Sequence, residues 1–486
     1  MEQLSDQASW LLETTIADLQ AAMADGKMTS RDLVFFYMQR IAAYDKSGPM
    51  INALLEINPD AVQIAEALDL ERQLRGPRGP LHGIPVLVKD NIDTADKLHT
   101  SAGSRALADS YASADSFVAA KLRRAGAVIM GKTNMTEWAN FMTAGMKNGY
   151  SSRGGQVQNP YGPGQFDVGG SSSGSGASVA CNFTTVAIGT ETSGSILSPA
   201  SGNSIVGIKP TVGLISRIGI IPIAHSQDTA GPMARTVADA ATLLGTLVGE
   251  DPLDAATLGS TGHYPQEYCQ FLDANGLQGA RIGIPRSYYA RLDGSRLTII
   301  NRAIDDLRAA GAIVIDPVEI PSSNEKSDSK VLVYEFKPNL NAYLGRLSPH
   351  VPVHSLRELI HYNQTNAETM LKYGQTLLVE TEATSGSLAD PEYIACRLRD
   401  LHSSIDQGID YVMQEHALDA LLFPGNFGAG IAARAGYPSI TVPGGYTAEG
   451  LPLGVTFAAR AYEEPMLIKL AYAFEQATHY RRPPQL

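Results

Sequence analysis

Twice along this 486-residue chain, an amphipathic helix passes through an Ala-Gly-Ala turn into a short apolar strand. The first unit is DSFVAAKLRRAGAVIMGKTNM at residues 115–135, and the second is LTIINRAIDDLRAAGAIVIDP at residues 297–317. Their flanking sequences do not match, so we interpret them as the common helix-to-strand connection of α/β proteins and not as an internal repeat. Further short apolar runs, which are typical of buried strands, occur at residues 83–93, 184–190, 204–210, 420–425, 439–445 and 450–459.

The predicted strands lie toward both ends of the chain and enclose a more polar, mostly helical part at residues 324–416. No low-complexity linker separates these parts. The pattern therefore predicts one α/β domain over residues 1–486 that carries a helical insertion. Residues 1–70 are predicted to be helical, with Thr29 as an N-cap and Asp32 three positions later, as in a capping box.

Charge and cysteine content argue against several functions. The formal net charge is −12, and no run of five basic residues occurs, so a nucleic-acid partner is not expected. Cys181, Cys269 and Cys396 are far apart, and no C-x-x-C occurs, which favours neither a disulfide framework nor a zinc site. The ten histidines contain no H-E-x-x-H, so we expect no metal.

Targeting signals are also missing from the sequence as given. No apolar run approaches the ~18 residues that span a bilayer, and the first twenty residues lack the basic and apolar regions of a signal peptide. We expect a cytoplasmic protein without a membrane partner. A secreted form whose signal has been removed stays open.

Residues 126–133, GAVIMGKT, match the phosphate-binding pattern G-x-x-x-x-G-K-[ST]. A P-loop needs its four variable residues in a loop between a strand and a helix. Here those residues are Ala-Val-Ile-Met, which favour the strand itself, and a helix precedes them. We therefore interpret the match around Lys132 as accidental.

The tract DVGGSSSGSGA at residues 167–177 raises the question of a nucleophile. Its G-x-S-x-G match would make Ser172 the nucleophile of an α/β-hydrolase, on a sharp turn after a strand. The preceding residues, NPYGPGQFDVGG, do not read as a strand, and no downstream Asp and His are marked out. A flexible linker also fits poorly, because a small, apolar stretch follows at once.

A second cluster of small residues, GTETSGS, follows at residues 189–195. Small residues let successive backbone N–H groups converge on one point, as in an anion-binding nest. Such a nest suits the oxyanion of an acyl-transfer intermediate, and Ser195 at its mouth is well placed to attack. These residues alone do not identify a general base.

The block GGSSSGSGASVACNFTTVAIGTETSGSILSPASGNSIVGIKPT at residues 169–211 resembles the signature of the amidase signature family of serine hydrolases. The segments GIPVLVKDNID, AGAVIMGKTNMTEWAN, ISRIGIIPIAHSQDTAGPMARTVADAA, AGYPSITVPGG and GLPLGVTFA also resemble family segments and occur in the family's order. The resemblance covers roughly residues 15–480. It implies one large domain with a mixed β-sheet covered by helices on both faces, and a signature core at residues 80–250.

The resemblance implies a triad of Ser195 as nucleophile, Ser171 after a cis peptide bond, and Lys89. The G-x-S-x-G match would then be accidental. A free lysine has a pKa near 10.4 and is no base at pH 7, but burial at the end of an apolar strand would lower it. We expect neutral Lys89 to take the proton of Ser171 as Ser171 takes that of Ser195, and Asp90 and Asp93 to point elsewhere into structural hydrogen bonds.

The oxyanion would be held by backbone N–H groups of residues 192–195, which are Thr192, Ser193, Gly194 and Ser195. Gly170 is expected among the oxyanion and substrate-binding residues as well, and it reduces the steric cost of the bond before Ser171. Ser193 stands where the family usually has glycine.

Leu197 stands where many family members have an arginine that can meet a substrate carboxylate. Its absence favours a neutral acyl group, and ETSGSILSP is similar to the peptide-amidase branch. We expect an enzyme without cofactor that hydrolyses neutral linear amides. Its small-molecule substrates would be peptide C-terminal amides, aliphatic amides or aryl amides. Ester or carbamate hydrolysis, or an amidotransferase A-type subunit acting on misacylated tRNA with partner subunits, remain alternatives, as do a monomer and a homodimer.

The walls of the substrate pocket are expected to come from the insertion at residues 324–416 and from the segment EWANFMTAGMKNGY. Four of its side chains either line an apolar cleft or belong to the core: Trp138, Phe141, Met142 and Tyr150.

Overall fold

The computed structural model describes residues 9–265, 267–325 and 328–486. The part of the predicted N-terminal helix that falls on residues 1–8 lies outside them.

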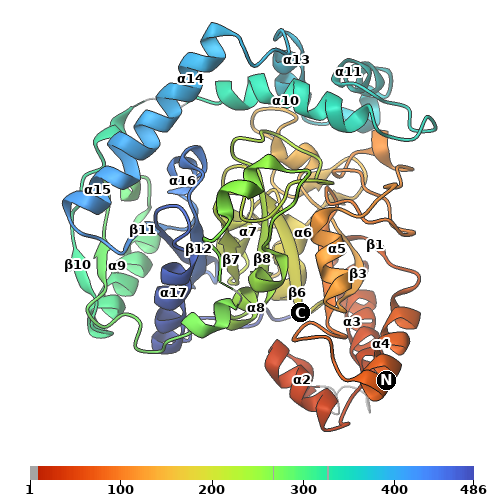
Figure 1. The fold of residues 1–486 in the computed structure, drawn as a ribbon, viewed down its shortest axis with the longest axis horizontal. Coiled ribbons are helices and arrows are strands. Elements are labelled where there is room, and N and C mark those ends of the chain that lie inside the picture. The colour runs from red at the N-terminus through yellow and green to blue at the C-terminus, as the bar shows by residue number, and fades with distance from the viewer. Residues whose placement is uncertain (1–8, 266, 326–327) are drawn as a thin grey trace.

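An eleven-stranded mixed sheet runs through the molecule, flanked by helices (Figure 1). The strand order is β1-β3-β2-β6-β8-β7-β12-β13-β11-β9-β10. The strands are β1 (Leu54–Ile57), β2 (Pro85–Lys89), β3 (Val128–Thr133), β6 (Val186–Glu191), β7 (Val206–Lys209), β8 (Thr229–Ala234), β9 (Arg281–Gly283), β10 (Ile313–Ile315), β11 (Ala420–Pro424), β12 (Ser439–Tyr446) and β13 (Pro452–Ala458). β2 pairs in parallel with both β3 and β6, whereas β6, β8 and β7 are joined antiparallel. The α/β fold class with a mixed sheet and flanking helices is confirmed.

Helices connect and cover these strands. Those associated with the sheet are α2 (Ile16–Ala24), α3 (Ser30–Tyr44), α4 (Ala61–Arg75), α5 (Phe117–Arg124), α6 (Ser173–Ala180), α7 (Leu197–Gly202), α8 (Val237–Leu247), α9 (Gly294–Ala309), α16 (Ala429–Ala435) and α17 (Glu464–Thr478). Both predicted helix-to-strand units are confirmed, as α5 followed by β3 and α9 followed by β10. The capping box at Thr29 is confirmed too, because its hydroxyl accepts from the Asp32 N–H while Asp32 accepts from the Thr29 N–H.

Three strands of the sheet, β1, β8 and the three-residue β9, were not predicted from the sequence. β1 lies within the 70 residues that we expected to be helical, where it adds an edge strand antiparallel to β3. A four-residue apolar run cannot be told from a helical segment by periodicity. β8 contains Gly231 and Pro232, residues that usually argue against a strand interior, yet it lies between β6 and β7.

Beyond residue 329 the chain forms a helical segment before it returns to the sheet at β11. Its elements are α10 (Lys330–Leu344), α11 (Leu356–Thr365), α12 (Ala367–Met370), α13 (Thr376–Glu382), α14 (Pro391–Leu401), a π-helix (His402–Ile409) and α15 (Asp410–Glu415). Figure 1 shows α10, α11, α13 and α14 along one end of the molecule, at the top of the view.

A second apolar core joins this helical segment to the rest of the domain. Trp138, Phe141 and Met142 are buried in it together with residues of α10, and the Phe141 ring packs on Phe336 with centroids 5.0 Å apart. Of the two interpretations of these side chains, core packing is therefore the one that the structure favours. Tyr150 is half-buried, and its ring packs on Tyr373 of the same segment with centroids 5.1 Å apart.

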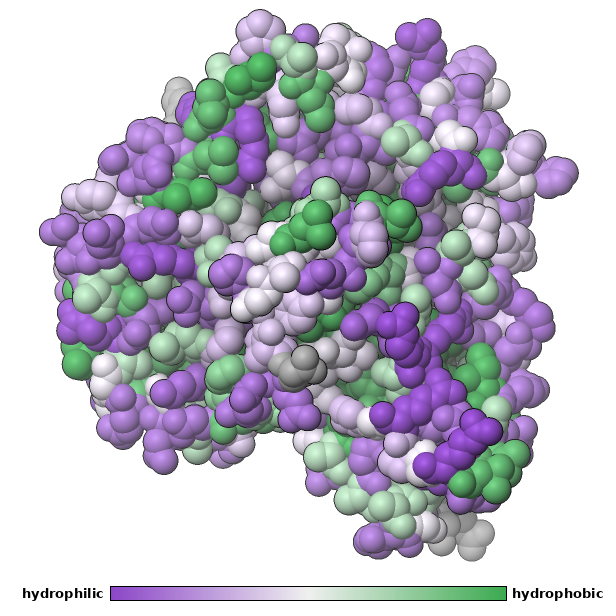
Figure 2. All heavy atoms as spheres, in the orientation of Figure 1, coloured by the Kyte–Doolittle hydropathy of each residue, from purple (hydrophilic) through white to green (hydrophobic). Residues whose placement is uncertain are grey.

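The surface in Figure 2 is mostly hydrophilic, with hydrophobic residues gathered in small groups between. Within the described parts of the chain, no helix is long and apolar enough to cross a membrane. All three cysteines are free, with Cys181 and Cys396 buried and Cys269 exposed.

Candidate active site

Neighbouring strands bring the three predicted triad residues to one edge of the sheet. Lys89 is the last residue of β2, and Ser195 follows the end of β6. Because β2 and β6 are parallel, with Val88 opposite Ile188, their carboxyl ends emerge on the same side, where α/β folds commonly place their sites. Ser171 precedes α6, and the adjacent Ser172 N–H donates to the Ser195 carbonyl at 3.1 Å. The two serine segments are therefore in direct contact.

Lys89 is fully buried and contacts uncharged oxygens. Its Nζ donates to Ser171 Oγ at 2.8 Å, to Thr190 Oγ1 at 2.9 Å and to the Thr190 carbonyl at 3.2 Å. Burial lowers the pKa of Lys89 to about 7, against the opposing charges of Glu191 and Asp228. A lysine with such a pKa is partly neutral at physiological pH and can act as a base.

The two aspartates that follow this lysine point elsewhere, as expected. Asp90 accepts from the Ser101 hydroxyl and, at 2.9 Å, from the Gly103 N–H. Asp93 accepts from the Tyr343 hydroxyl at 2.8 Å, which ties the loop after Lys89 to α10. Burial raises the pKa of both aspartates to about 6.

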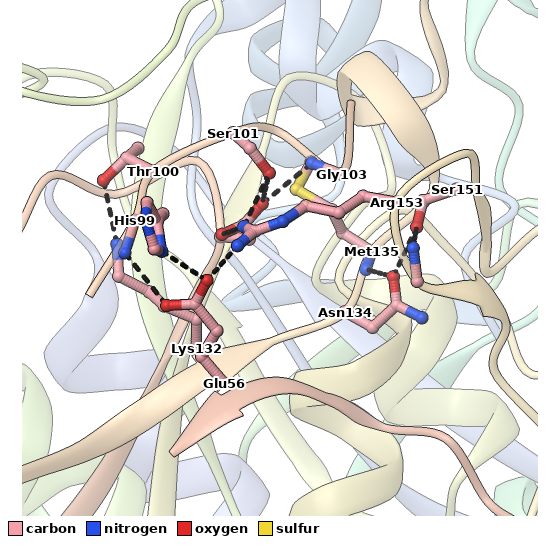
Figure 3. Close-up of polar contacts among 12 residues, drawn as sticks. Glu56, His99, Thr100, Ser101, Gly103, Lys132, Asn134, Met135, Ser151 and Arg153 are labelled. Carbon is pink, nitrogen blue, oxygen red and sulfur yellow. Dashed lines mark hydrogen bonds and ion pairs between the residues drawn. The ribbon is translucent and has the colours of Figure 1, made fainter. Parts of the chain in front are cut away.

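A second buried lysine, Lys132, lies in a separate polar network beside this loop (Figure 3). Its Nζ donates to the Thr100 hydroxyl at 3.0 Å and to the Ile92 carbonyl. In the same network Glu56 accepts from His99 and Arg153. Lys132 lies inside β3, so the interpretation of the GAVIMGKT match as a strand and not a phosphate loop is confirmed.

The serines differ in access. Ser171 is fully buried, and Ser195 is 8% exposed. The peptide bond between Gly170 and Ser171 is cis. Glycine fits before it, because a Cβ on Gly170 would lie 2.6 Å from Thr136 Oγ1 and 2.7 Å from Asn148 Oδ1. Among the described residues no hydrogen bond joins the hydroxyls of Ser171 and Ser195, so that step of the relay stays a prediction.

The loop before Ser195 is organised by Glu191, whose carboxylate accepts three backbone N–H groups. These come from Gly194 and Ile196, both at 2.7 Å, and from Leu197 at 3.0 Å. Gly194 has φ of +85°, a conformation that favours glycine. Its N–H is committed to Glu191, which corrects the expectation that it would face an oxyanion.

Three of the four predicted oxyanion donors remain available. The N–H groups of Thr192, Ser193 and Ser195 have no protein partner in the described parts of the chain. Ser193 is exposed and has no left-handed φ, so serine fits in place of the family's usual glycine. The Thr192 hydroxyl donates to Asp228 at 2.5 Å, and burial raises the pKa of Asp228 to about 6.

A narrow cavity of about 10 Å³ adjoins this loop. Its lining includes Asn91, Thr190, Thr192 and Asp228, with Ala139 from the segment after β3. None of the four proposed pocket residues lines it. Among the described residues no group of three His, Cys, Asp or Glu side chains is arranged to hold a metal ion.

Four residues around the site were given no role from the sequence: Asn91, Thr190, Glu191 and Asp228. Thr190 and Glu191 lie in the quoted GTETSGS stretch, and a carboxylate at the end of an apolar strand was a visible signal for Glu191. Asp228 reaches the loop from the start of the neighbouring strand β8, which was not predicted. Asn91 donates to the Thr190 hydroxyl at 3.0 Å, a contact between two segments that the sequence does not place together.

Known proteins resemble this chain over nearly all of its length. The Amidase family profile matches residues 32–430. A probable amidase of Arabidopsis thaliana is 43% identical and aligns with 97% of this chain and 91% of its own length.

Two solved structures are similar as well. The native peptide amidase from Stenotrophomonas maltophilia is 45% identical, with a TM-score of 0.89 and coverage of 98% of this chain and 99% of that one. An amidase family protein from Bacillus anthracis is 39% identical, with a TM-score of 0.95 and coverage of 100% and 95%. The chain therefore belongs to the Amidase family and is an amidase, a hydrolase that acts on carbon–nitrogen bonds.

Proposed function

We propose that this amidase hydrolyses neutral linear carboxylic amides, including the C-terminal amides of peptides, through an acyl-enzyme on Ser195. The observation that carries the proposal is the 2.8 Å hydrogen bond between Lys89 Nζ and Ser171 Oγ. It couples a buried amine with a pKa of about 7 to a hydroxyl whose chain segment contacts that of Ser195.

In the proposed reaction, neutral Lys89 accepts the proton of Ser171 while Ser171 accepts that of Ser195. The Ser195 oxygen attacks the amide carbon, and the carbonyl oxygen gains the negative charge. The free N–H groups of Thr192, Ser193 and Ser195 support a site for that oxyanion. The proton returns along the same path to the leaving nitrogen, the C–N bond breaks, and water then hydrolyses the ester by the reverse relay.

The preference for a neutral substrate is supported by Leu197. This residue is fully buried and stands where many family members carry a substrate-facing arginine. Its side chain offers no charge to a substrate carboxylate. The 45% identity to a peptide amidase over nearly the whole chain favours peptide amides within the neutral class.

Ester or carbamate hydrolysis is the alternative within the same chemistry, because the same nucleophile and oxyanion site would serve amides, esters and carbamates. An amidotransferase A-type subunit is the alternative that would require partner proteins.

Amine or ammonia release from four matched compounds tests the proposal: an aliphatic primary amide, a C-terminally amidated dipeptide, an anilide and a carbamate. Ser195→Ala is the blank. We expect release from the amidated dipeptide that disappears in the blank. Release that persists in Ser195→Ala, or exclusive turnover of the carbamate, would contradict the proposal.

A further inference from the structure

We infer that Thr190 is a positioning residue that directs the lone pair of Lys89 toward Ser171, and that Ser172 and Asn91 hold Thr190 in place. The inference rests on the proposed triad and adds to it three residues that have no role in the relay itself.

The number of hydrogen bonds that the lysine amine can donate limits where its lone pair can point. A neutral amine has two N–H donors and one lone pair, and the ammonium has three donors. Lys89 Nζ has three hydrogen-bonding oxygens around it, and two of them belong to Thr190. The Thr190 carbonyl can only accept. When the Thr190 hydroxyl accepts the second N–H, the lone pair faces Ser171.

The same three oxygens satisfy the ammonium once the proton has moved. All three of its donors then have acceptors at 2.8 to 3.2 Å. The proton can therefore arrive and leave without a rearrangement of the Lys89 side chain, as is expected of a preorganised site.

Thr190 is itself held on both its backbone and its side chain. The Ser172 hydroxyl donates to the Thr190 carbonyl at 3.0 Å and accepts from the Thr190 N–H at 3.2 Å. Asn91 Nδ2 donates to Thr190 Oγ1 at 3.0 Å. All three residues are buried. Ser172, the serine that the G-x-S-x-G pattern singled out, thus acts as a clamp on the residue that orients the base.

Thr190→Val tests the inference, because it removes the hydroxyl and keeps the size of the side chain. We expect kcat to fall about 10- to 100-fold, the range of one hydrogen bond to a charged group, with KM unchanged. The ammonium loses one acceptor, so the pKa of Lys89 falls and the acid limb of kcat moves to lower pH. A loosened site that admitted water would move that limb to higher pH instead.

Thr190→Ser is the rescue variant, because it restores the hydroxyl, and we expect it to keep most of the wild-type kcat and pH profile. Thr441→Val is the matched control. It removes a buried hydroxyl from β12 of the same sheet and should leave the profile unchanged. Within the described residues, the Thr441 hydroxyl forms its hydrogen bond with the Thr456 hydroxyl, at 2.6 Å. Wild-type kcat in Thr190→Val, or equal losses in the serine and valine variants, would overturn the inference.

Two measurements keep the test decisive. Where Thr190→Val does not fold, Ser172→Ala removes the clamp without touching Lys89, and unchanged kcat there would overturn the inference. The pKa of Lys89 can also be followed without turnover, by NMR titration of protein labelled with ¹³C at lysine Cε. Its fall in Thr190→Val supports the positioning role and an unchanged value overturns it, whereas activity in Ser195→Ala would contradict only the proposed function.

Discussion

Lys89 and Lys132 are both fully buried, and they lie on neighbouring strands where Lys89 pairs with Thr133 and Val88 with Lys132. Burial lowers the pKa of both. The difference lies in their surroundings. Lys132 is attracted by Asp90, Asp93 and Asp96 and donates into a closed network, whereas Lys89 donates to a serine that adjoins the partly exposed Ser195.

Burial alone therefore does not make a lysine a general base. Both side chains lose the solvation that stabilises their charge. Only Lys89 has a hydroxyl partner with a route to the surface, and only it lacks an adjacent group of three carboxylates. The surroundings of the amine, and not its depth, separate the proposed catalyst from the structural residue.

The largest expected effect comes from removing the proposed base or its relay. Lys89→Met and Ser171→Ala should each lower kcat/KM by about 10³-fold, within the range of general acid–base catalysis, while the protein stays folded. Initial rates with the amidated dipeptide, together with circular dichroism, measure this. A rate within a few-fold of wild type in either variant would contradict the relay.

The pH dependence of the wild-type enzyme should be the next largest effect. Lys89 must be neutral to accept a proton, so kcat/KM should rise with pH through about 7, the pKa of Lys89. Below that pH it should fall about tenfold per unit. A pH–rate profile on the same substrate measures the limb, and a flat profile from pH 5 to 8 would count against Lys89 as the base.

The lowered pKa of Lys89 should also change how the free energy of unfolding depends on pH. Its pKa is near 7 in the folded protein and near 10.5 in the unfolded chain. Between these values the unfolded state binds more protons, so this residue makes stability rise with pH across that window. Urea titrations at pH 7.5 and 9.5 should show a smaller rise in Lys89→Met than in wild type, and equal rises would argue against a buried, shifted lysine.

Lys132→Met should lower stability more than activity, the opposite of what we expect for Lys89→Met. The variant leaves Asp90 and Asp93 buried without Lys132, a cation that lowers the pKa of both. We expect the free energy of unfolding to drop by about 3 kcal/mol, with far less loss of kcat per folded molecule than in Lys89→Met. If Lys132→Met were as inactive as Lys89→Met while folded, the division between the two lysines would be wrong.

The smallest expected effect is that of Glu191→Gln. The amide cannot accept all three backbone N–H groups of the Ser195 loop, so we expect kcat to fall about 10-fold. The charge of Glu191 raises the pKa of Lys89, so its loss should move the acid limb to lower pH. Glu464→Gln is the control, since Glu464 is another buried carboxylate that accepts a backbone N–H, from Thr211, away from the triad. An unshifted limb in Glu191→Gln would rule out this coupling.

Much of the fold follows from local patterns. The Ala-Gly-Ala connections, the capping box at Thr29 and the apolar run ending at Lys89 each depend on neighbouring residues, and sequence reasoning located them. β1, β8 and β9 were missed because their stability comes from pairing with distant strands. Pro232 and Gly231 of β8 disfavour a strand locally, and tertiary context overrides that preference.

The candidate site divides in the same way. Lys89, Ser171 and Ser195 were identified through a resemblance in sequence motifs. The hydrogen bond from the Gly194 N–H to Glu191 could not be predicted. A carboxylate beside such a loop can face the backbone N–H groups or point away from them, and composition does not say which. Asp228 and Asn91 reach the site from other segments of the chain, so their contacts depend on strand order.

The hydrogen bond between Asp93 and Tyr343 has a consequence for any exchange of the helical segment. Every side chain of the proposed proton path lies within residues 89–195, and the helical segment after residue 329 contributes none of them. We therefore expect that this segment can be exchanged for another without removing any side chain of the proposed proton path. A graft of this kind has to retain one tether, a hydroxyl donor at position 343 for the carboxylate that follows the base by four residues.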